Sequence, residues 1–304
     1  MQISLLLASA TSTALAAITC NVPDNKPSSI PLDCQVCLDS IIISNNSSTW
    51  PTTKLALQEI RGRLVVQAAI PEHLDIPLTV ETLELHGALP SELEINRISA
   101  KVLHVNRVCN FPVVEFDSIS PDVVIFEESY VQLYGVSSER ISQLSAHVSI
   151  IYNTEFPNLK RVGSISLFKT MLDSEEMFPA LEEAHSVKVD FTQMRTLSLP
   201  VTKVTGTVEI ANNFKLTMVA FPGLKKVGGD FLVYGPGQVH SLTLPQLKEV
   251  NYMAIQSKTN SLEMPRDVAW STKSYFNVPS FCEKHAPALN QAKLGFISAR
   301  PCQS

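Results

Sequence analysis

The chain has 304 residues and a formal net charge of −5, so it has no overall basic field to attract nucleic acid or an anionic membrane. Charged residues make up 17% of the sequence, below the roughly 25% typical of globular proteins. Apolar residues make up 45%. This balance favours extended, weakly charged β-surface over charged helix faces.

Residues 1–17 have the features of a secretory signal peptide. An apolar stretch at 3–8 leads to small residues at 14–17 that suit a cleavage site, although the segment before it lacks Lys and Arg. The apolar run is too short to span a bilayer. We therefore expect a secreted protein without a transmembrane segment.

Six cysteines, an even number, predict three disulfides in a secreted protein. Three lie in an amino-terminal cap, residues 18–40, and two in a carboxy-terminal cap, residues 277–304. The candidates are Cys20, Cys34, Cys37, Cys109, Cys282 and Cys302. We expect a bridge between Cys282 and Cys302, and a bridge from the amino-terminal cluster to Cys109, whose partner stays open. The spacing of Cys34 and Cys37 also occurs in redox and zinc sites, but a structural bridge fits a secreted chain better.

Asn45 and Asn46 begin two overlapping N-glycosylation sequons, each completed by a serine at the second position after the asparagine. In a secreted protein we expect one sugar at this site, with an unmodified loop as the alternative.

An apolar residue followed by proline recurs along the chain. The pairs are Leu89-Pro90, Phe111-Pro112, Phe156-Pro157, Phe178-Pro179, Leu199-Pro200, Phe221-Pro222, Leu244-Pro245 and Met264-Pro265. From Pro157 onward successive prolines are about 22 residues apart, a period typical of a stacked solenoid.

Each repeat contains a short run in which inward-facing apolar residues alternate with outward-facing residues, as a half-buried strand requires. The clearest runs are Ile165-Ser166-Leu167, Val187-Lys188-Val189, Val208-Glu209-Ile210 and Phe231-Leu232-Val233. We predict an all-β fold, a parallel β-helix over residues 41–276 with about ten coils of ~22 residues, beginning at a strand over 41–43. A leucine-rich horseshoe with one helix per repeat is the alternative, but no repeat shows a helical apolar period.

The repeat at 221–230, followed by the similar run at 242–250, resembles that of fungal cell-wall glycoproteins of the extracellular-mutant and sporulation-specific type. Those repeats are similar to the receptor L domains of insulin- and EGF-receptor ectodomains. The resemblance implies a β-helical, secreted or wall-associated protein that supports cell-wall organisation without chemistry of its own. Family members usually end in a Ser/Thr-rich stretch and a lipid-anchor signal. Residues 277–304 contain neither, so a freely secreted relative is also expected.

Parallel β-helices also include polysaccharide lyases and hydrolases, which need two converging carboxylates. Asp190, Glu209 and Asp230 each lie at a different distance past their prolines, so we expect no acidic ladder on neighbouring coils. The seven histidines are dispersed without ligand spacing. The glycines at 228–229 lack the lysine of a phosphate-binding loop. We therefore predict no catalytic site, no metal and no cofactor.

Three aromatic residues, Phe168, Phe191 and Tyr234, lie at nearly the same distance past their prolines. On stacked coils such residues form a column. Burial favours a stack inside the helix, whereas an outward column would be a surface platform for sugar rings or a protein partner.

We thus expect a non-enzymatic, secreted or cell-wall-associated protein that presents a β-helical face to a cell-wall polysaccharide or an extracellular protein. The alternatives are a polysaccharide-active β-helical enzyme and a secreted effector. Because a fold does not fix a function, this expectation depends on the resemblance.

Overall fold

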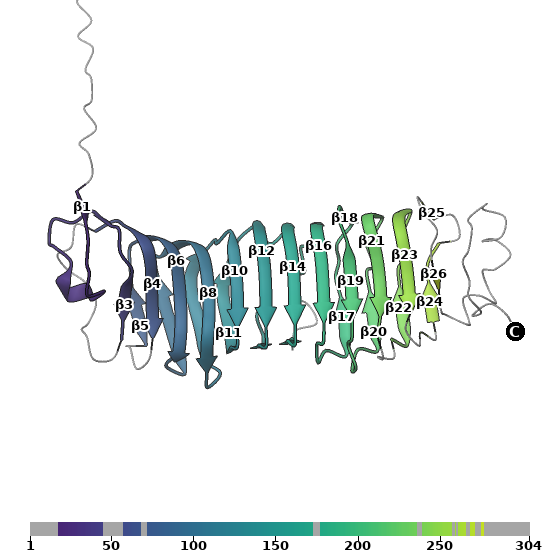
Figure 1. Ribbon diagram of the computed structural model, residues 1–304, viewed down its shortest axis with the longest axis horizontal. Helices are drawn as coiled ribbons and strands as arrows, with labels where there is room; N and C mark the ends of the chain where they lie inside the picture. Colours follow the sequence, from purple (N-terminus) through teal and green to yellow (C-terminus); the bar gives the residue numbers. More distant parts are fainter. Residues whose placement is uncertain are drawn as a thin grey trace, which may run out of the picture.

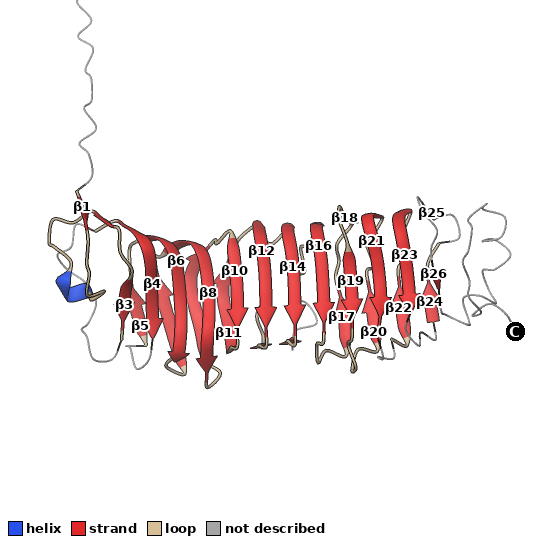
Figure 2. Cartoon of the chain, viewed as in Figure 1, coloured by secondary structure: helices blue, strands red, loops and turns tan. Residues whose placement is uncertain are grey.

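The computed structural model describes residues 18–44, 57–67, 72–172, 177–235, 239–256, 259, 261–265, 268–270 and 275–276. Figure 1 shows its strands side by side in chain order along one long axis, and Figure 2 shows that nearly all of the described regular structure is strand. The single helical element among these residues is the 3-10 turn η1 (Pro27–Ser29). The predicted parallel β-solenoid is confirmed, and the horseshoe with helices is excluded.

One long sheet of sixteen strands runs the length of the solenoid. Its strands are β1 (Thr19–Cys20), β2 (Val36–Cys37), β3 (Ile41–Ile43), β4 (Glu59–Gln67), β6 (Thr79–Ala88), β8 (Ser99–Cys109), β10 (Val123–Glu127), β12 (Arg140–His147), β14 (Arg161–Phe168), β16 (Glu183–Asp190), β18 (Lys203–Val204), β19 (Val208–Ala211), β21 (Lys226–Tyr234), β23 (Glu249–Gln256), β25 (Ala269–Trp270) and β26 (Tyr275–Phe276).

Two shorter sheets complete the coils. The first contains β5 (His73–Asp75), β7 (Glu92–Asn96), β9 (Val113–Ile119), β11 (Tyr130–Val136), β13 (Ile150–Ile151) and β15 (Met171–Leu172). The second contains β17 (Thr196–Ser198), β20 (Met218–Ala220), β22 (Ser241–Thr243) and β24 (Ser261–Glu263).

Every strand pairing among the described residues is parallel, and each coil lies in register with the next. One inward column illustrates the stacking: Leu83, Leu103, Val124, Leu144, Ile165, Val187, Val208, Phe231 and Met253 are level on successive strands, and all are buried. About ten turns are present, at the spacing that the prolines indicated. The core is therefore a continuous apolar filling along the axis, because each coil covers the apolar side chains of the previous one.

Four of the recurring prolines, Pro157, Pro179, Pro222 and Pro245, occupy β-turns. The amide of Leu159 donates to the carbonyl of Phe156 across Pro157, and the same bond joins Leu224 to Phe221 across Pro222. Proline favours the second position of such a turn because its φ is preset there. Its missing N–H thus removes no bond from the sheet.

The ladder begins earlier than predicted. Strands β1 and β2 pair with each other, and β2 continues onto β4, so residues 19–37 already belong to the solenoid. The strand over 41–43 is the third strand, not the first. The cap strands were not recognised because each is only two residues long, too short to show alternation.

Candidate functional site

The strands of the long sheet end at corners that share the same backbone arrangement. One residue of each corner has a positive φ, and the next residue is buried and points inward. The positive-φ residues are Arg107, Glu128, Val148, Lys169, Phe191 and Asn212, with φ between 47 and 55°. Since alternation would place only every second residue outside, this corner exposes one extra residue per coil.

The buried residue after the positive φ is polar on five successive coils: Ser129, Ser149, Thr170, Thr192 and Asn213. The Ser129 hydroxyl donates to the Val105 carbonyl at 3.0 Å, and the Asn213 amide donates to the Val189 carbonyl at 2.9 Å. Such bonds link a coil to the one before it and satisfy carbonyls that the bend removes from the sheet. This polar ladder was not predicted, although its members recur in the sequence at the same period as the prolines.

Four aromatic rings line the outside of the same corner on four successive coils. The ring centroids of His147 and Phe168 are 5.2 Å apart, those of Phe168 and Phe191 are 5.8 Å apart, and those of Phe191 and Phe214 are 6.3 Å apart. Phe214 is 63% exposed and Phe191 39%. We call His147, Phe168, Phe191 and Phe214 the aromatic column.

The expectation of an internal stack of Phe168, Phe191 and Tyr234 is wrong. Phe168 and Tyr234 are half-buried at outward positions, and Phe191 is exposed at the corner. The register also separates Phe168 from Tyr234, because Asp190 and Ala211 lie between them on the intervening strands.

Phe156, Phe178 and Phe221, each directly before a proline, are among the aromatic residues that fill the interior, together with Phe116, Phe126 and Phe231. The Phe156 and Phe178 rings stack at 5.6 Å, both almost fully buried. Phe221 and Phe231 meet edge to face at 5.7 Å.

Polar side chains border the aromatic column on the outer face of the long sheet. Asp190 is level with Phe168 on the neighbouring strand, and its carboxylate accepts a hydrogen bond from the Asn212 amide at 3.0 Å. Glu209 accepts a hydrogen bond from the Tyr234 hydroxyl and pairs with the Lys188 ammonium at 3.2 Å. The bond to Glu209 raises the pKa of Tyr234 to about 12, so this phenol stays a neutral donor at physiological pH.

The three acidic residues considered for catalysis occupy three different columns. Asp190 is level with Ala211, Glu209 with Lys188, and Asp230 with Tyr252. The prediction that they form no ladder is confirmed. No group of three or more His, Cys, Asp or Glu among the described residues could hold a metal ion.

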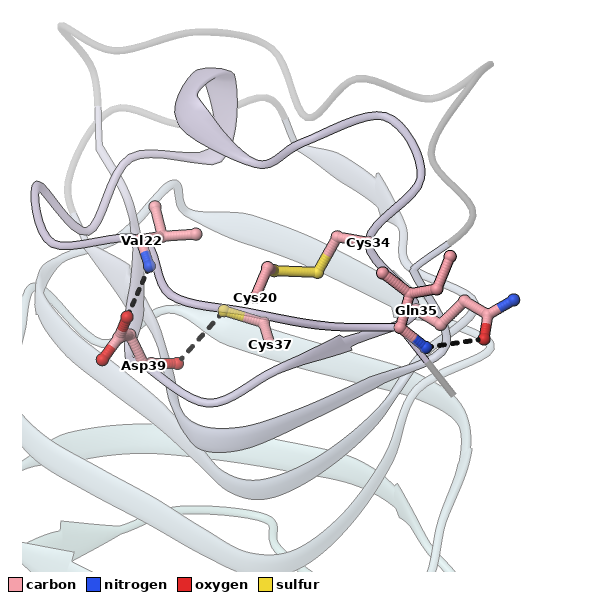
Figure 3. Close-up of a disulfide and its surroundings, with 7 residues drawn as sticks. Cys20, Val22, Cys34, Gln35, Cys37 and Asp39 are labelled. Carbon is pink, nitrogen blue, oxygen red and sulfur yellow. Dashed lines mark hydrogen bonds between the residues drawn. A yellow bond between two sulfur atoms is a disulfide. The ribbon is translucent and has the colours of Figure 1, made fainter. Parts of the chain in front are cut away.

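The amino-terminal cysteines are arranged differently from the prediction. Cys20 and Cys34 form a disulfide, whereas Cys37 is a buried free thiol (Figure 3). Cys109 is an exposed free thiol. The predicted bridge to Cys109 is wrong, because the register places Cys37 level with Ile60, Val80 and Ala100. Cys109 therefore lies three strands away and at the far end of β8, beyond the ~7 Å limit for bridging Cα atoms.

Burial raises the pKa of the Cys37 thiol, whose sulfur lies 3.6 Å from the Asp39 carbonyl (Figure 3). The remaining sequence-based sites, the signal peptide over 1–17, Asn45, Asn46, Cys282 and Cys302, lie outside the described residues.

Comparisons of the chain with models of known families, with curated proteins and with solved structures give no match. Within the part of the chain that the structure describes, no helix is long and apolar enough to cross a membrane.

Proposed function

We propose that this protein is a non-enzymatic extracellular binding protein whose aromatic column holds a glycan chain, and that it supports the organisation of a cell wall. The observation that carries the proposal is the outward position of four rings on successive coils. Exposed, contiguous apolar side chains on a folded protein mark interaction surfaces.

Sugar chemistry fits this surface better than a purely apolar partner does. A sugar ring offers C–H groups on its face and hydroxyls at its edge, so it needs aromatic faces next to hydrogen-bonding groups. Asp190 and Asn212 supply a carboxylate and an amide beside Phe168 and Phe191. Because the rings follow the stacking direction, the chain that they hold would extend along the solenoid axis.

An extracellular setting is supported by the Cys20–Cys34 disulfide, since such bonds persist mainly in oxidising compartments. The cell-wall role rests on the resemblance of the repeats to those of fungal wall glycoproteins. Asp190, Glu209 and Asp230 occupy different columns and form no ladder of carboxylates, which is why we propose binding without catalysis.

The proposal is tested with the double variant Phe191→Ala/Phe214→Ala and soluble neutral oligosaccharides of β-1,3-glucan and chitin. We expect at least one of these to bind the natural protein, and the double variant to lose about tenfold or more in affinity, because each stacked ring contributes about 0.5–1.5 kcal/mol beyond its buried area. Isothermal titration calorimetry measures the difference.

Phe111→Ala is the matched control. Phe111 is also an exposed phenylalanine with a positive φ of 52°, but its ring contacts Tyr130, outside the aromatic column. An equal loss in this control, or binding of none of the oligosaccharides, would contradict the proposal. Steady release of shortened sugars during the titration would instead favour the enzymatic alternative.

A further inference from the structure

The opposite ends of the long-sheet strands, where β12, β14, β16 and β18 begin, form a groove of about 270 Å³. Its lining includes the side chains of Arg140, Arg161, Glu183, His185 and Thr205. The groove is separate from the aromatic column, whose members lie at or shortly after the opposite ends of β12, β14, β16 and β19.

Gly163 belongs to the lining of this groove, at a position with no room for a side chain. Gly163 lies next to Ser142 on the preceding coil, and a Cβ on Gly163 would stand 2.1 Å from the Ser142 carbonyl oxygen. A Cβ on Gly206 would stand 2.7 Å from the His185 carbonyl oxygen in the same way. The backbones of successive coils therefore approach closely beside the arginines.

The two arginines of the groove face each other as like charges. Arg140 is directly level with Arg161 on the neighbouring strand, an arrangement that is destabilising in a sheet without compensation. Arg161 is compensated by Glu183 at 3.6 Å, but Glu183 also pairs with Lys203 at 3.3 Å. Within the described part of the chain, Arg140 has no ion pair with a carboxylate.

The charge of this corner is opposite to that of the whole protein. Its two outermost columns consist of the first residue of each long-sheet strand and the residue before it. From residue 139 to residue 249 these columns contain seven basic residues and four acidic ones. The basic residues are Arg140, Lys160, Arg161, Lys203, Lys225, Lys226 and Lys248, and the acidic residues are Glu139, Glu182, Glu183 and Glu249. The chain as a whole carries −5. A local basic strip on an acidic protein attracts an anionic partner over about a Debye length.

We infer that this groove binds the acidic groups, carboxylate or sulfate, of an anionic polysaccharide. The guanidinium of Arg140 donates to one such group together with that of Arg161, in the forked geometry that favours arginine at oxyanion sites. The hydroxyl of Thr205 and the ring of His185, bonded to each other at 2.8 Å, form the far wall.

A polymer with spaced acidic groups fits this strip better than a membrane or a nucleic acid. Glu182, Glu183 and Glu249 interrupt the basic residues, so the strip is not the uninterrupted basic cluster that an anionic lipid surface selects. The described lining of the groove contains no Phe, Tyr or Trp to stack on a base.

The test measures fluorescence anisotropy of a labelled oligogalacturonate with the natural protein and with Arg140→Gln/Arg161→Gln. We expect binding that weakens as salt rises, and a loss of about tenfold or more in the double variant, because two charge-assisted hydrogen bonds are removed. An unlabelled sulfated oligosaccharide should compete, whereas a neutral β-1,3-glucan of equal length should not.

Arg61→Gln/Lys101→Gln removes the same charge from the amino-terminal part of this side, where Glu59 and Glu81 pair with these residues. We expect this control to bind within about twofold of the natural protein, because it leaves the groove intact. Circular dichroism verifies the fold of both variants.

Equal losses in the two double variants would overturn the inference, and so would equally effective competition by phosphatidylserine vesicles. The variant Phe191→Ala/Phe214→Ala should retain oligogalacturonate binding. Failure of one proposal would therefore leave the other unaffected.

Discussion

Asn213 shows how a single buried polar side chain holds a corner of the solenoid. Its carbonyl oxygen accepts from the backbone amide and the hydroxyl of Thr192, both at 2.7 Å, while its amide donates to Val189. All three groups belong to the neighbouring coil. A shorter side chain would leave them buried without partners.

We predict that Asn213→Ala lowers the free energy of unfolding by about 1–3 kcal/mol, the cost of buried donors and acceptors left unsatisfied. Gln193→Ala changes an exposed side chain on the adjacent coil and should stay within about 0.5 kcal/mol of the natural protein. Urea unfolding followed by circular dichroism measures both, and equal stabilities of the two variants would contradict the role of Asn213.

For single residues, the sequence predicted which strand residues are buried, but it did not predict which way the corner residues point. The alternation of Val187 and Val189 correctly gave the inward face of their strand. Phe191 was misplaced because counting from the proline assumes an unbroken period of two. The positive φ at Phe191 inserts a second outward residue after Asp190, and nothing in a phenylalanine signals such a backbone conformation.

The positions of the strands were predicted well from the sequence. The positions where the backbones of neighbouring coils approach most closely were not predicted. The runs over 165–167 and 231–233 lie within β14 and β21, as their alternation indicated. Glycine between strand runs is typical of a corner, but Gly163 lies inside β14, against the carbonyl of Ser142. The sequence could not show this, because the neighbour that excludes a side chain lies on the preceding coil.

We predict that Gly163→Ala destabilises the protein by about 2–3 kcal/mol, because its Cβ would meet backbone that cannot move aside without breaking the ladder. Gly87→Ala is the comparison: Gly87 has a φ of +73° and open space where the added Cβ would lie, so its cost is the conformational one of about 1 kcal/mol. Thermal unfolding of the two variants measures the difference. A smaller effect at Gly163 than at Gly87 would show that the coils are not this closely packed.

For the whole molecule, the period of the prolines was sufficient to predict a parallel solenoid of about ten turns. The pairing of distant cysteines was not predictable in the same way. In a solenoid each coil contacts only its neighbours, so residues several coils apart cannot bridge, and the relevant distance is the number of coils between them. Cys20 and Cys34 do bridge, because β1 and β2 are adjacent strands.

The stacking also determines which aromatic residues can contact a ligand. In-register coils place Phe156, Phe178 and Phe221 inside. Phe191 is itself the added corner residue, and Phe214 follows the buried Asn213 at the next outward position. The proposed glycan site depends on this division, since a buried ring could not contact a sugar.

Hydroxyl-radical footprinting of the free protein, read by mass spectrometry, tests this division most directly. We predict that Phe191 and Phe214 are oxidised rapidly, while Phe156, Phe178 and Phe221 stay protected until the protein unfolds, because radicals react with side chains that water reaches. Rapid oxidation of the three buried rings, or protection of Phe191 and Phe214 in the free protein, would contradict the arrangement from which the proposed function is argued.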